Sequence, residues 1–139
     1  WIRLAGVAGH QYMWDWAGVP IIQIPQDIVQ FQQLVFDIKP DLIIETGIAR
    51  GGSMALSASL LCLLDVMDGI DPRFSQRKVL GIDIDIREHT WQSLDTHPLR
   101  FKMELIEGSS IDPSVIENVK KFAQDMKTFT RNEVKTSGI

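Results

Sequence analysis

Apolar and polar residues follow one another with several different spacings along the chain, and each change of spacing predicts a new element. Beyond Pro25, apolar residues recur every three or four positions up to Ile38, with glutamine and aspartate between them, which predicts an amphipathic helix. The helix is expected to end before Pro40, because proline disfavours helical geometry in the residue that precedes it. Residues 42–45 are then dominated by consecutive apolar positions, the pattern of a parallel strand covered by helices on both faces.

A core helix and a second strand are expected next. Residues 54–67 form the longest apolar stretch, but serine and aspartate interrupt it, and it is shorter than the roughly 20 residues that cross a membrane. We therefore expect a buried helix here and no membrane span. After a polar connection, residues 78–85 form a second apolar run that ends in two aspartates.

The same pattern occurs a third time in the C-terminal part. A helical spacing around Trp91 precedes a third strand at residues 103–107, and Pro113 opens a last helix with Asp112 as its N-cap. Strands that alternate with helices form parallel sheets covered by helices. The sequence thus predicts an α/β fold: a doubly wound (Rossmann-like) parallel sheet, of which this chain supplies the N-terminal βαβαβ half.

Aromatic residues are concentrated at the N-terminus. Gly18 and Pro20 break any long helix there, so we expect residues 1–25 to form an irregular or short extended arm. Its aromatic side chains are expected to pack against the domain or a second subunit, with a lid over a substrate pocket as the alternative. Residues 26–125 are expected to form the folded unit and residues 126–139 a polar tail. The aromatic residues of the arm are Trp1, Tyr12, Trp14 and Trp16.

Charge and cysteine content narrow the class of protein. The formal net charge is −4, with 18 acidic and 14 basic residues and no cluster of lysine or arginine. We expect no nucleic-acid partner, because the surface that binds nucleic acid is basic. Cys62 is the only cysteine and lies within an apolar run. We therefore expect a structural thiol, no disulfide within the chain, and a reducing, cytoplasmic location.

Residues 45–53 carry the clearest candidate chemistry. Glu45 ends the first strand, three glycines follow it, and a helix begins at Ser53. Glycine lets the backbone approach a ligand closely, and a helix N-terminus offers unpaired N–H groups and a partial positive charge to an anion. The carboxylate of Glu45 can in turn hold a cationic amine. The segment therefore suits a ligand that carries both charges, such as the aminocarboxylate end of S-adenosylmethionine.

Three other interpretations of this glycine-rich segment were considered. A phosphate-binding P-loop requires a lysine before the final serine, where this chain has Gly52. A dinucleotide fingerprint requires a second glycine where this chain has Ala49. A plain turn between strand and helix fits the residues and stays open as an alternative.

The other two strands end in residues suited to the same ligand. Ligands bind sheets of this kind at the carboxyl ends of the strands, so we expect one site to gather residues from all three loops. Asp83 is placed to accept hydrogen bonds from ribose hydroxyls. The alternative is that it caps a helix or lies in a solvated turn, and this alternative has more weight for Asp85 than for Asp83. Residues 108–110 form the third loop. The histidines lie outside any metal-ligand spacing and are expected to be surface or structural residues: His10, His89 and His97.

Four segments, taken in order, resemble those of a known family. Residues 16–27, 40–53, 80–85 and 107–110 are similar to class I S-adenosylmethionine-dependent methyltransferases, and within them to the group called cephalosporin hydroxylase or rhamnosyl O-methyltransferase. The resemblance covers most of residues 12–118. It implies that Asp83 contacts the ribose of the cofactor and that Ser109 and Ser110 contact its adenine edge. The residues that it implies for the methionine part are Glu45, Gly47, Gly51 and Ser53.

The same resemblance implies an activity and a metal. It implies methyl transfer to a hydroxyl of a sugar or antibiotic-like small molecule, with Mg²⁺ lowering the pKa of that hydroxyl. In the family the metal ligands and the general base come from a fourth strand and the segments after it, and no further apolar strand follows Val119 here. We therefore expect the catalytic residues beyond residue 139 and no metal ligands in this chain. Asp85 is a second-choice neighbour of the ribose or the metal.

Two alternative functions and one physical property follow from this comparison. An iron hydroxylase is disfavoured, because the sequence shows no triad of two histidines and one carboxylate. A non-catalytic module that binds S-adenosylmethionine, a nucleotide or a partner protein remains the alternative. Without a fourth strand, the strand at residues 42–45 has an open apolar edge, so we expect self-association into a homo-oligomer or marginal stability.

Overall fold

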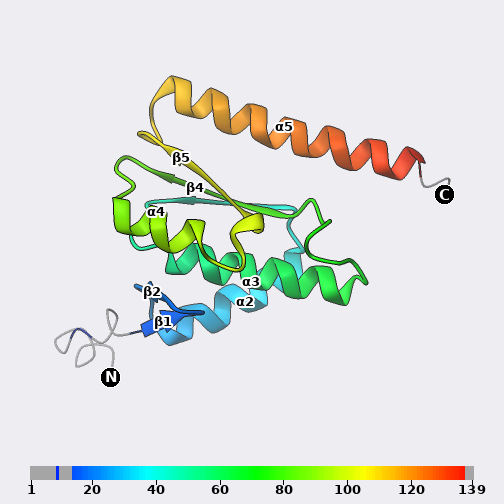
Figure 1. Ribbon diagram of the computed structural model, residues 1–139. Helices are drawn as coiled ribbons and strands as arrows, with labels where there is room; N and C mark the ends of the chain where they lie inside the picture. The colour runs from blue at the N-terminus through cyan, green and yellow to red at the C-terminus, as the bar shows by residue number, and fades with distance from the viewer. Residues whose placement is uncertain (1–8, 10–13, 137–139) are drawn as a thin grey trace.

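From Pro25 onward, the described helices and the strands of the sheet follow the predicted order (Figure 1). The computed structural model describes Gly9 and residues 14–136, with side chains as far as residue 127. The predictions for Trp1, His10 and Tyr12 lie outside these residues. The elements are β1 (Trp14–Trp16), β2 (Val19–Ile21), α2 (Pro25–Ile38), β3 (Leu42–Thr46), α3 (Gly52–Met67), β4 (Lys78–Asp83), α4 (Glu88–Asp95), the 3₁₀ turn η2 (Arg100–Lys102), β5 (Met103–Glu107) and α5 (Pro113–Thr136).

The three longer strands form one parallel sheet in the order β3, β4, β5. In the register of this sheet, Glu45 of β3 is opposite Gly81 of β4, and Ile82 of β4 is opposite Ile106 of β5. Each strand is connected to the next by a helix, because parallel neighbours require a crossover connection. The predicted α/β class with a partial Rossmann-like parallel sheet is therefore confirmed.

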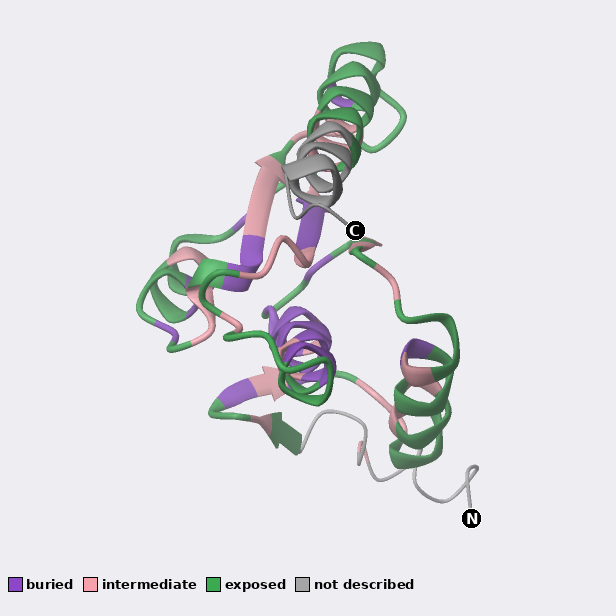
Figure 2. Cartoon of the chain, turned by 90° about the vertical axis from the view of Figure 1, so that its right-hand side faces the viewer, coloured by how far each residue is buried: buried purple, intermediate pink, exposed green. Residues whose placement is uncertain are grey.

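Helices cover the sheet from two sides. α3 and α4 lie on one face, and α5 lies on the other (Figure 1). α3 is the centre of the core, with ten buried residues, and its buried turns are surrounded by the other elements (Figure 2). Gly81 permits this close packing, since a Cβ atom there would overlap the side chains of Met54 and Ile48. Within the described residues, no helix is both long and apolar enough to cross a bilayer.

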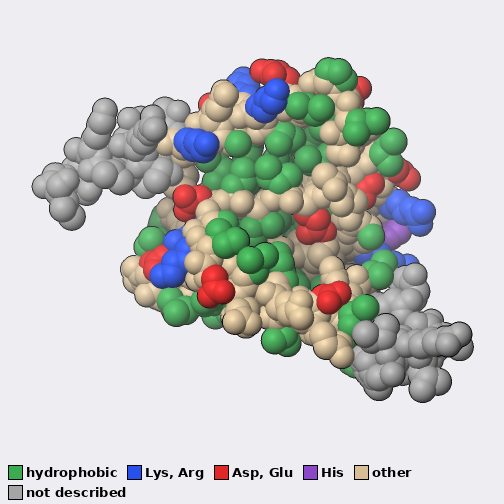
Figure 3. All heavy atoms as spheres, turned by 180° about the vertical axis from the view of Figure 1, so that it is seen from behind, with side chains coloured by type: hydrophobic (Ala, Val, Ile, Leu, Met, Phe, Trp, Pro, Cys, Tyr) green, Lys and Arg blue, Asp and Glu red, His purple; other side chains and the backbone are tan. Residues whose placement is uncertain are grey.

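The prediction that the first strand is covered on both faces was wrong. Ile44, in the middle of β3, is 46% exposed. β3 is an edge strand among the described residues, with β4 on one side only. Seen from behind, the molecule is hollowed in its middle, and hydrophobic side chains dominate the floor of the hollow (Figure 3).

The N-terminal segment forms a hairpin where the sequence predicted an irregular or short extended arm. β1 and β2 pair in antiparallel fashion around the residues Ala17 and Gly18, both of which have positive φ. Positive φ at both central residues is the geometry of the two-residue turns that match the twist of paired strands. The Trp16 indole Nε1 donates a hydrogen bond to Ser59 Oγ in α3 at 3.0 Å. The described part of the arm therefore packs against the domain.

The opposite end of the sheet carries a buried ion-pair network. Lys102 Nζ lies 2.5 Å from Asp65 Oδ2, and both side chains are 0% exposed. Arg77 Nη1 donates to the other carboxylate oxygen of Asp65 at 2.8 Å, and the Ser75 hydroxyl donates to the same oxygen at 2.7 Å. The network joins the end of α3 to the starts of β4 and β5. Cys62 lies nearby, and partial burial raises the pKa of its thiol, which fits the predicted structural role.

Candidate functional site

The loop between β3 and α3 depends on glycine at two positions. Gly47 has φ of +78° and Gly51 has φ of +88°, a conformation that other residues adopt only with strain. Nothing lies near the place of a Cβ atom at Gly47, whereas one at Gly51 would overlap the Leu94 side chain. Gly47 therefore leaves open space above the strand, and Gly51 lets α4 pack against the loop. Ala49, with φ of +46°, takes the same conformation without glycine.

Glu45 lies at the base of this loop. Its carboxylate accepts a hydrogen bond from the hydroxyl of Ser53, in the first turn of α3. Burial raises the pKa of Glu45, and the Ser53 hydrogen bond partly offsets this by lowering it. Among the described basic side chains, none forms an ion pair with Glu45. A partly desolvated carboxylate without a cation is stabilised by a ligand that brings one.

Asp83 holds the other side of the loop. Its Oδ2 accepts hydrogen bonds from the backbone N–H groups of Ile48 at 2.9 Å and Ala49 at 3.3 Å. Its Oδ1 accepts a third, from Asp85 N at 3.3 Å. The strand and the loop are further tied by Gly47 N, which donates to Ile82 O at 2.8 Å. Asp83 thus uses its carboxylate to fix the backbone that follows Glu45.

A cavity of about 690 Å³ opens beside Glu45. Its lining combines the β3–α3 loop with an apolar wall from α2 and the segment after the hairpin. Of the predicted site residues, it includes Glu45, Gly47 and Ser53. The lining residues are Pro20, Ile22, Gln23, Asp27, Ile28, Phe31, Ile43, Ile44, Glu45, Thr46, Gly47, Ile48, Ala49, Arg50, Gly52, Ser53, Leu56 and Ser57.

Four predicted site residues lie outside this lining: Gly51, Asp83, Ser109 and Ser110. The reasons differ. Gly51 is buried against α4, and the Asp83 carboxylate faces the loop backbone. The two serines follow β5, which β4 separates from β3. The tips of β4 and β5 are nevertheless joined, because Gly108 N donates to Asp83 O at 2.7 Å.

Sequence reasoning missed two parts of the cavity. Arg50 lines it and is exposed, so its guanidinium is available to an anionic group. Ile28 and Phe31 of α2 also line it. The helical spacing of α2 did identify both as members of an apolar face. It carried no signal that this face turns toward a cavity.

The residues do not fit the metal that the family resemblance implies. Across the described ranges, no group of three or more His, Cys, Asp or Glu side chains is placed to hold a metal ion. Asp85, the second-choice metal neighbour, is exposed at the tip of β4. We therefore derive no step through a metal.

Comparison with family models assigns the chain to one family. The model of a family described as rhamnosyl O-methyltransferase/CmcI matches residues 8–130. A rhamnosyl O-methyltransferase of Mycobacterium leprae (strain TN) is 26% identical over 117 residues, which cover 82% of this chain and 45% of the relative. The chain thus spans less than half the length of this curated relative. A solved structure described as "cmcI-N160 SAH" is 23% identical with a TM-score of 0.48, over 69% of this chain and 43% of that one.

Proposed function

The chain belongs to the rhamnosyl O-methyltransferase/CmcI family, and on that premise we propose that it forms the S-adenosylmethionine-binding part of an O-methyltransferase. The observation that carries the proposal is the partly buried Glu45 carboxylate, which forms no ion pair with a described basic side chain and lies beneath a glycine loop in an open cavity. The cofactor's ammonium group supplies the missing cation.

The two charges of the amino-acid part of the ligand would bind at different groups of the loop. Glu45 accepts hydrogen bonds from the ammonium group of the ligand, while the Ser53 hydroxyl holds the Glu45 carboxylate in place. The Arg50 guanidinium and the first N–H groups of α3 receive the ligand carboxylate. Gly47 leaves the space that the ligand backbone requires, because a side chain there would extend into it.

Asp83 is proposed to bind the ribose while it keeps the loop in place. An ionised carboxylate has about four acceptor positions, and the three backbone hydrogen bonds leave one for a ribose hydroxyl. Ser109 and Ser110 complete the proposal at the adenine edge, since β5 ends next to β4 at the same edge of the sheet. Gly51 contributes by allowing α4 to support the loop.

S-adenosylmethionine supplies an activated methyl group on a sulfonium, so the protein's task is to bind and orient the donor and the acceptor. The acceptor is proposed to be a hydroxyl of a sugar or antibiotic-like small molecule. We assign no catalytic base to the described residues. A cytoplasmic location and a homo-oligomeric state belong to the same proposal, the first from the single cysteine and the second from the open edge of β3.

Calorimetric titration of the folded chain with S-adenosylhomocysteine tests the proposal. We expect binding by the wild type and loss of about tenfold or more in affinity for Glu45→Gln, which removes the charge and keeps the shape. The control is Glu88→Gln, because Glu88 is an exposed residue of α4 outside the cavity. A wild-type sample that is folded and gives no heat and no shift in unfolding temperature would overturn the proposal.

A non-catalytic binding module is the second candidate. The roles proposed above for Glu45, Ser53 and Asp83 are all binding roles, and they suit a binding module as well as an enzyme. The two functions differ in one measurement: transfer of a labelled methyl group to a panel of sugar hydroxyls with added Mg²⁺. Binding of S-adenosylhomocysteine without transfer would select the module.

A further inference from the structure

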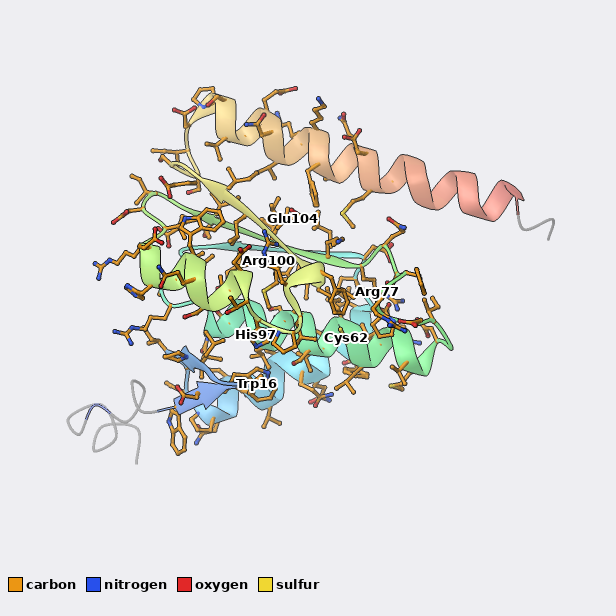
Figure 4. All side chains as sticks on the ribbon, in the orientation of Figure 1. Trp16, Cys62, Arg77, His97, Arg100 and Glu104 are labelled. Carbon is orange, nitrogen blue, oxygen red and sulfur yellow. The ribbon has the colours of Figure 1, made fainter. Side chains whose placement is uncertain are left out.

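His97 joins two parts of the chain that are 80 residues apart. It follows α4 and is buried, and its Nε2 lies 3.1 Å from the carbonyl oxygen of Ala17 in the turn of the hairpin. Its Nδ1 accepts a hydrogen bond from Leu99 N at 3.1 Å. Figure 4 shows His97 near Trp16, the hairpin residue that precedes Ala17.

The Leu99 hydrogen bond determines the tautomer of His97. A ring nitrogen that accepts a hydrogen bond carries no proton, so the proton of the neutral ring is on Nε2. Nε2 therefore donates to the Ala17 carbonyl. Both ring nitrogens are used, one toward the hairpin and one toward the connection between α4 and β5.

The residue that His97 holds has an unfavourable backbone conformation. Ala17 has φ of +49°, which a residue with a Cβ atom adopts with strain. Such a conformation persists where the surrounding structure holds it in place. The pairing of β1 with β2 and the hydrogen bond of Trp16 to Ser59 hold the hairpin near the turn. The His97 hydrogen bond is made to Ala17 itself.

The hairpin in turn shapes the cavity. Pro20, the middle residue of β2, lines the cavity together with Ile22 and Gln23, which follow the hairpin. The hairpin also lies directly on the start of α3, because a Cβ atom at Gly52 would overlap Pro20 O and Ile21. Gly52 precedes Ser53, whose hydroxyl holds Glu45. A shift of the hairpin would therefore change both a wall of the cavity and the support of Glu45.

We propose that His97 is a positioning residue for the S-adenosylmethionine site. It is not among the residues that line the cavity, and it acts by holding Ala17 so that the hairpin stays against the start of α3. The inference rests on the proposed function for the identity of the ligand. The hairpin contact itself can be tested without any ligand.

Two substitutions separate the hydrogen bonds of His97. In His97→Gln the side-chain amide nitrogen occupies the region of Nε2 and can donate to Ala17. In His97→Asn the amide oxygen occupies the region of Nδ1 and can accept from Leu99, but the side chain is too short to reach Ala17. Ser93→Ala is the control, because its hydroxyl bonds only to a backbone carbonyl within α4.

The rate of amide hydrogen exchange at Val19 and Ile21, measured without ligand, reports how often the hairpin opens. Titration with S-adenosylhomocysteine reports the affinity of the site. We expect His97→Asn to raise hairpin exchange and to weaken binding about fivefold, whereas His97→Gln and Ser93→Ala stay within about twofold of the wild type. Trp16→Phe, which removes the Ser59 hydrogen bond and loosens the same hairpin, should weaken binding as well. It serves as the second variant if His97→Asn does not fold.

Two results would overturn the role proposed for His97, and a third would overturn the proposed function. A protected hairpin and wild-type affinity in His97→Asn would overturn the proposal, and so would equal losses in the asparagine and glutamine variants, which indicate a general structural role. If the wild type binds no S-adenosylhomocysteine, the proposed function fails. The exchange measurement then still decides whether His97 holds the hairpin.

Discussion

Glu45 and Asp83 project from the same face of the parallel sheet. Glu45 is opposite Gly81 in the register, and Asp83 follows Gly81 by two positions on β4, so the two side chains lie on one side. That side is the one covered by α3, as the proximity of Gly81 to Met54 shows. The two acids are thus placed to act on one ligand, which is the geometric requirement of the proposed site.

The pH dependence of stability should report the burial of Glu45. Its pKa is raised in the folded chain, so the folded chain holds this proton more tightly than the unfolded chain. Stability should therefore fall as the pH rises from the ordinary pKa of glutamate through the raised value. Glu45→Gln should remove this fall and raise the unfolding temperature at neutral pH. Thermal unfolding, followed from the ordinary pKa of glutamate up to neutral pH, checks the sign.

Asp83→Asn should loosen the loop. The amide retains one oxygen and so cannot accept all three backbone hydrogen bonds from Ile48, Ala49 and Asp85. We expect a loss of about 1–2 kcal/mol in the free energy of unfolding, measured in urea, and about tenfold weaker binding of S-adenosylhomocysteine. Asp95→Asn, on the exposed end of α4, is the control. Unchanged stability and affinity in Asp83→Asn would contradict the assigned role.

The two loop glycines should respond differently to alanine. Gly51→Ala adds both backbone strain and an overlap with Leu94, so we expect a loss of about 2–4 kcal/mol in stability. Gly47→Ala adds strain in open space and should cost about 1 kcal/mol. Ligand affinity should show the reverse order, because only the Gly47 side chain would enter the cavity. Equal effects of the two changes on stability would be inconsistent with this packing.

Lys102→Met should destabilise the chain without affecting the site. The change leaves the buried Asp65 carboxylate with one cation, Arg77, in place of two. Removal of one partner from a buried ion pair costs about 3–5 kcal/mol, and urea unfolding measures it. Arg73→Gln, which breaks the exposed pair with Asp71, should leave the urea midpoint nearly unchanged. Affinity for S-adenosylhomocysteine, measured where the variant is folded, should stay at the wild-type level.

The exposed edge of β3 should cause self-association. Its outer side has no neighbouring strand among the described residues. Ile44, whose side chain projects from the face opposite Glu45, is exposed on this strand. We expect sedimentation velocity to show mass that increases with concentration, and Ile44→Lys to reduce this increase. A monomeric wild-type chain with a cooperative urea transition at all concentrations would show the expectation to be wrong.

Local signals in the sequence predicted most of the elements. The helical spacing after Pro25 and the proline at residue 40 located α2, and consecutive apolar residues located β3. The other two strands of the sheet were located as short segments rich in apolar residues between helices. Strand 103–107 was predicted with its observed bounds. The last helix extends to Thr136, through most of the segment expected to be a polar tail.

Long-range contacts could not be predicted in the same way. Lys102 is a charged residue between Phe101 and Met103, and its burial depends on the arrival of Asp65 from 37 residues away. Asp83 was expected to face a ribose, and its use by the loop backbone depends on where Ile48 and Ala49 lie in space. The short antiparallel hairpin depends on Ala17 taking a conformation that its residue type disfavours.

The buried pair of Asp65 and Lys102 has a consequence for the order of folding. Asp65 belongs to the first helix after β3, whereas Lys102 is reached only after β4 and α4. Until that later segment arrives, the C-terminal end of α3 can be buried only with its charge incompletely compensated. During synthesis, β3 and α3 therefore cannot complete the packing of this end of α3 on their own, because Lys102 in η2 must first leave the ribosome.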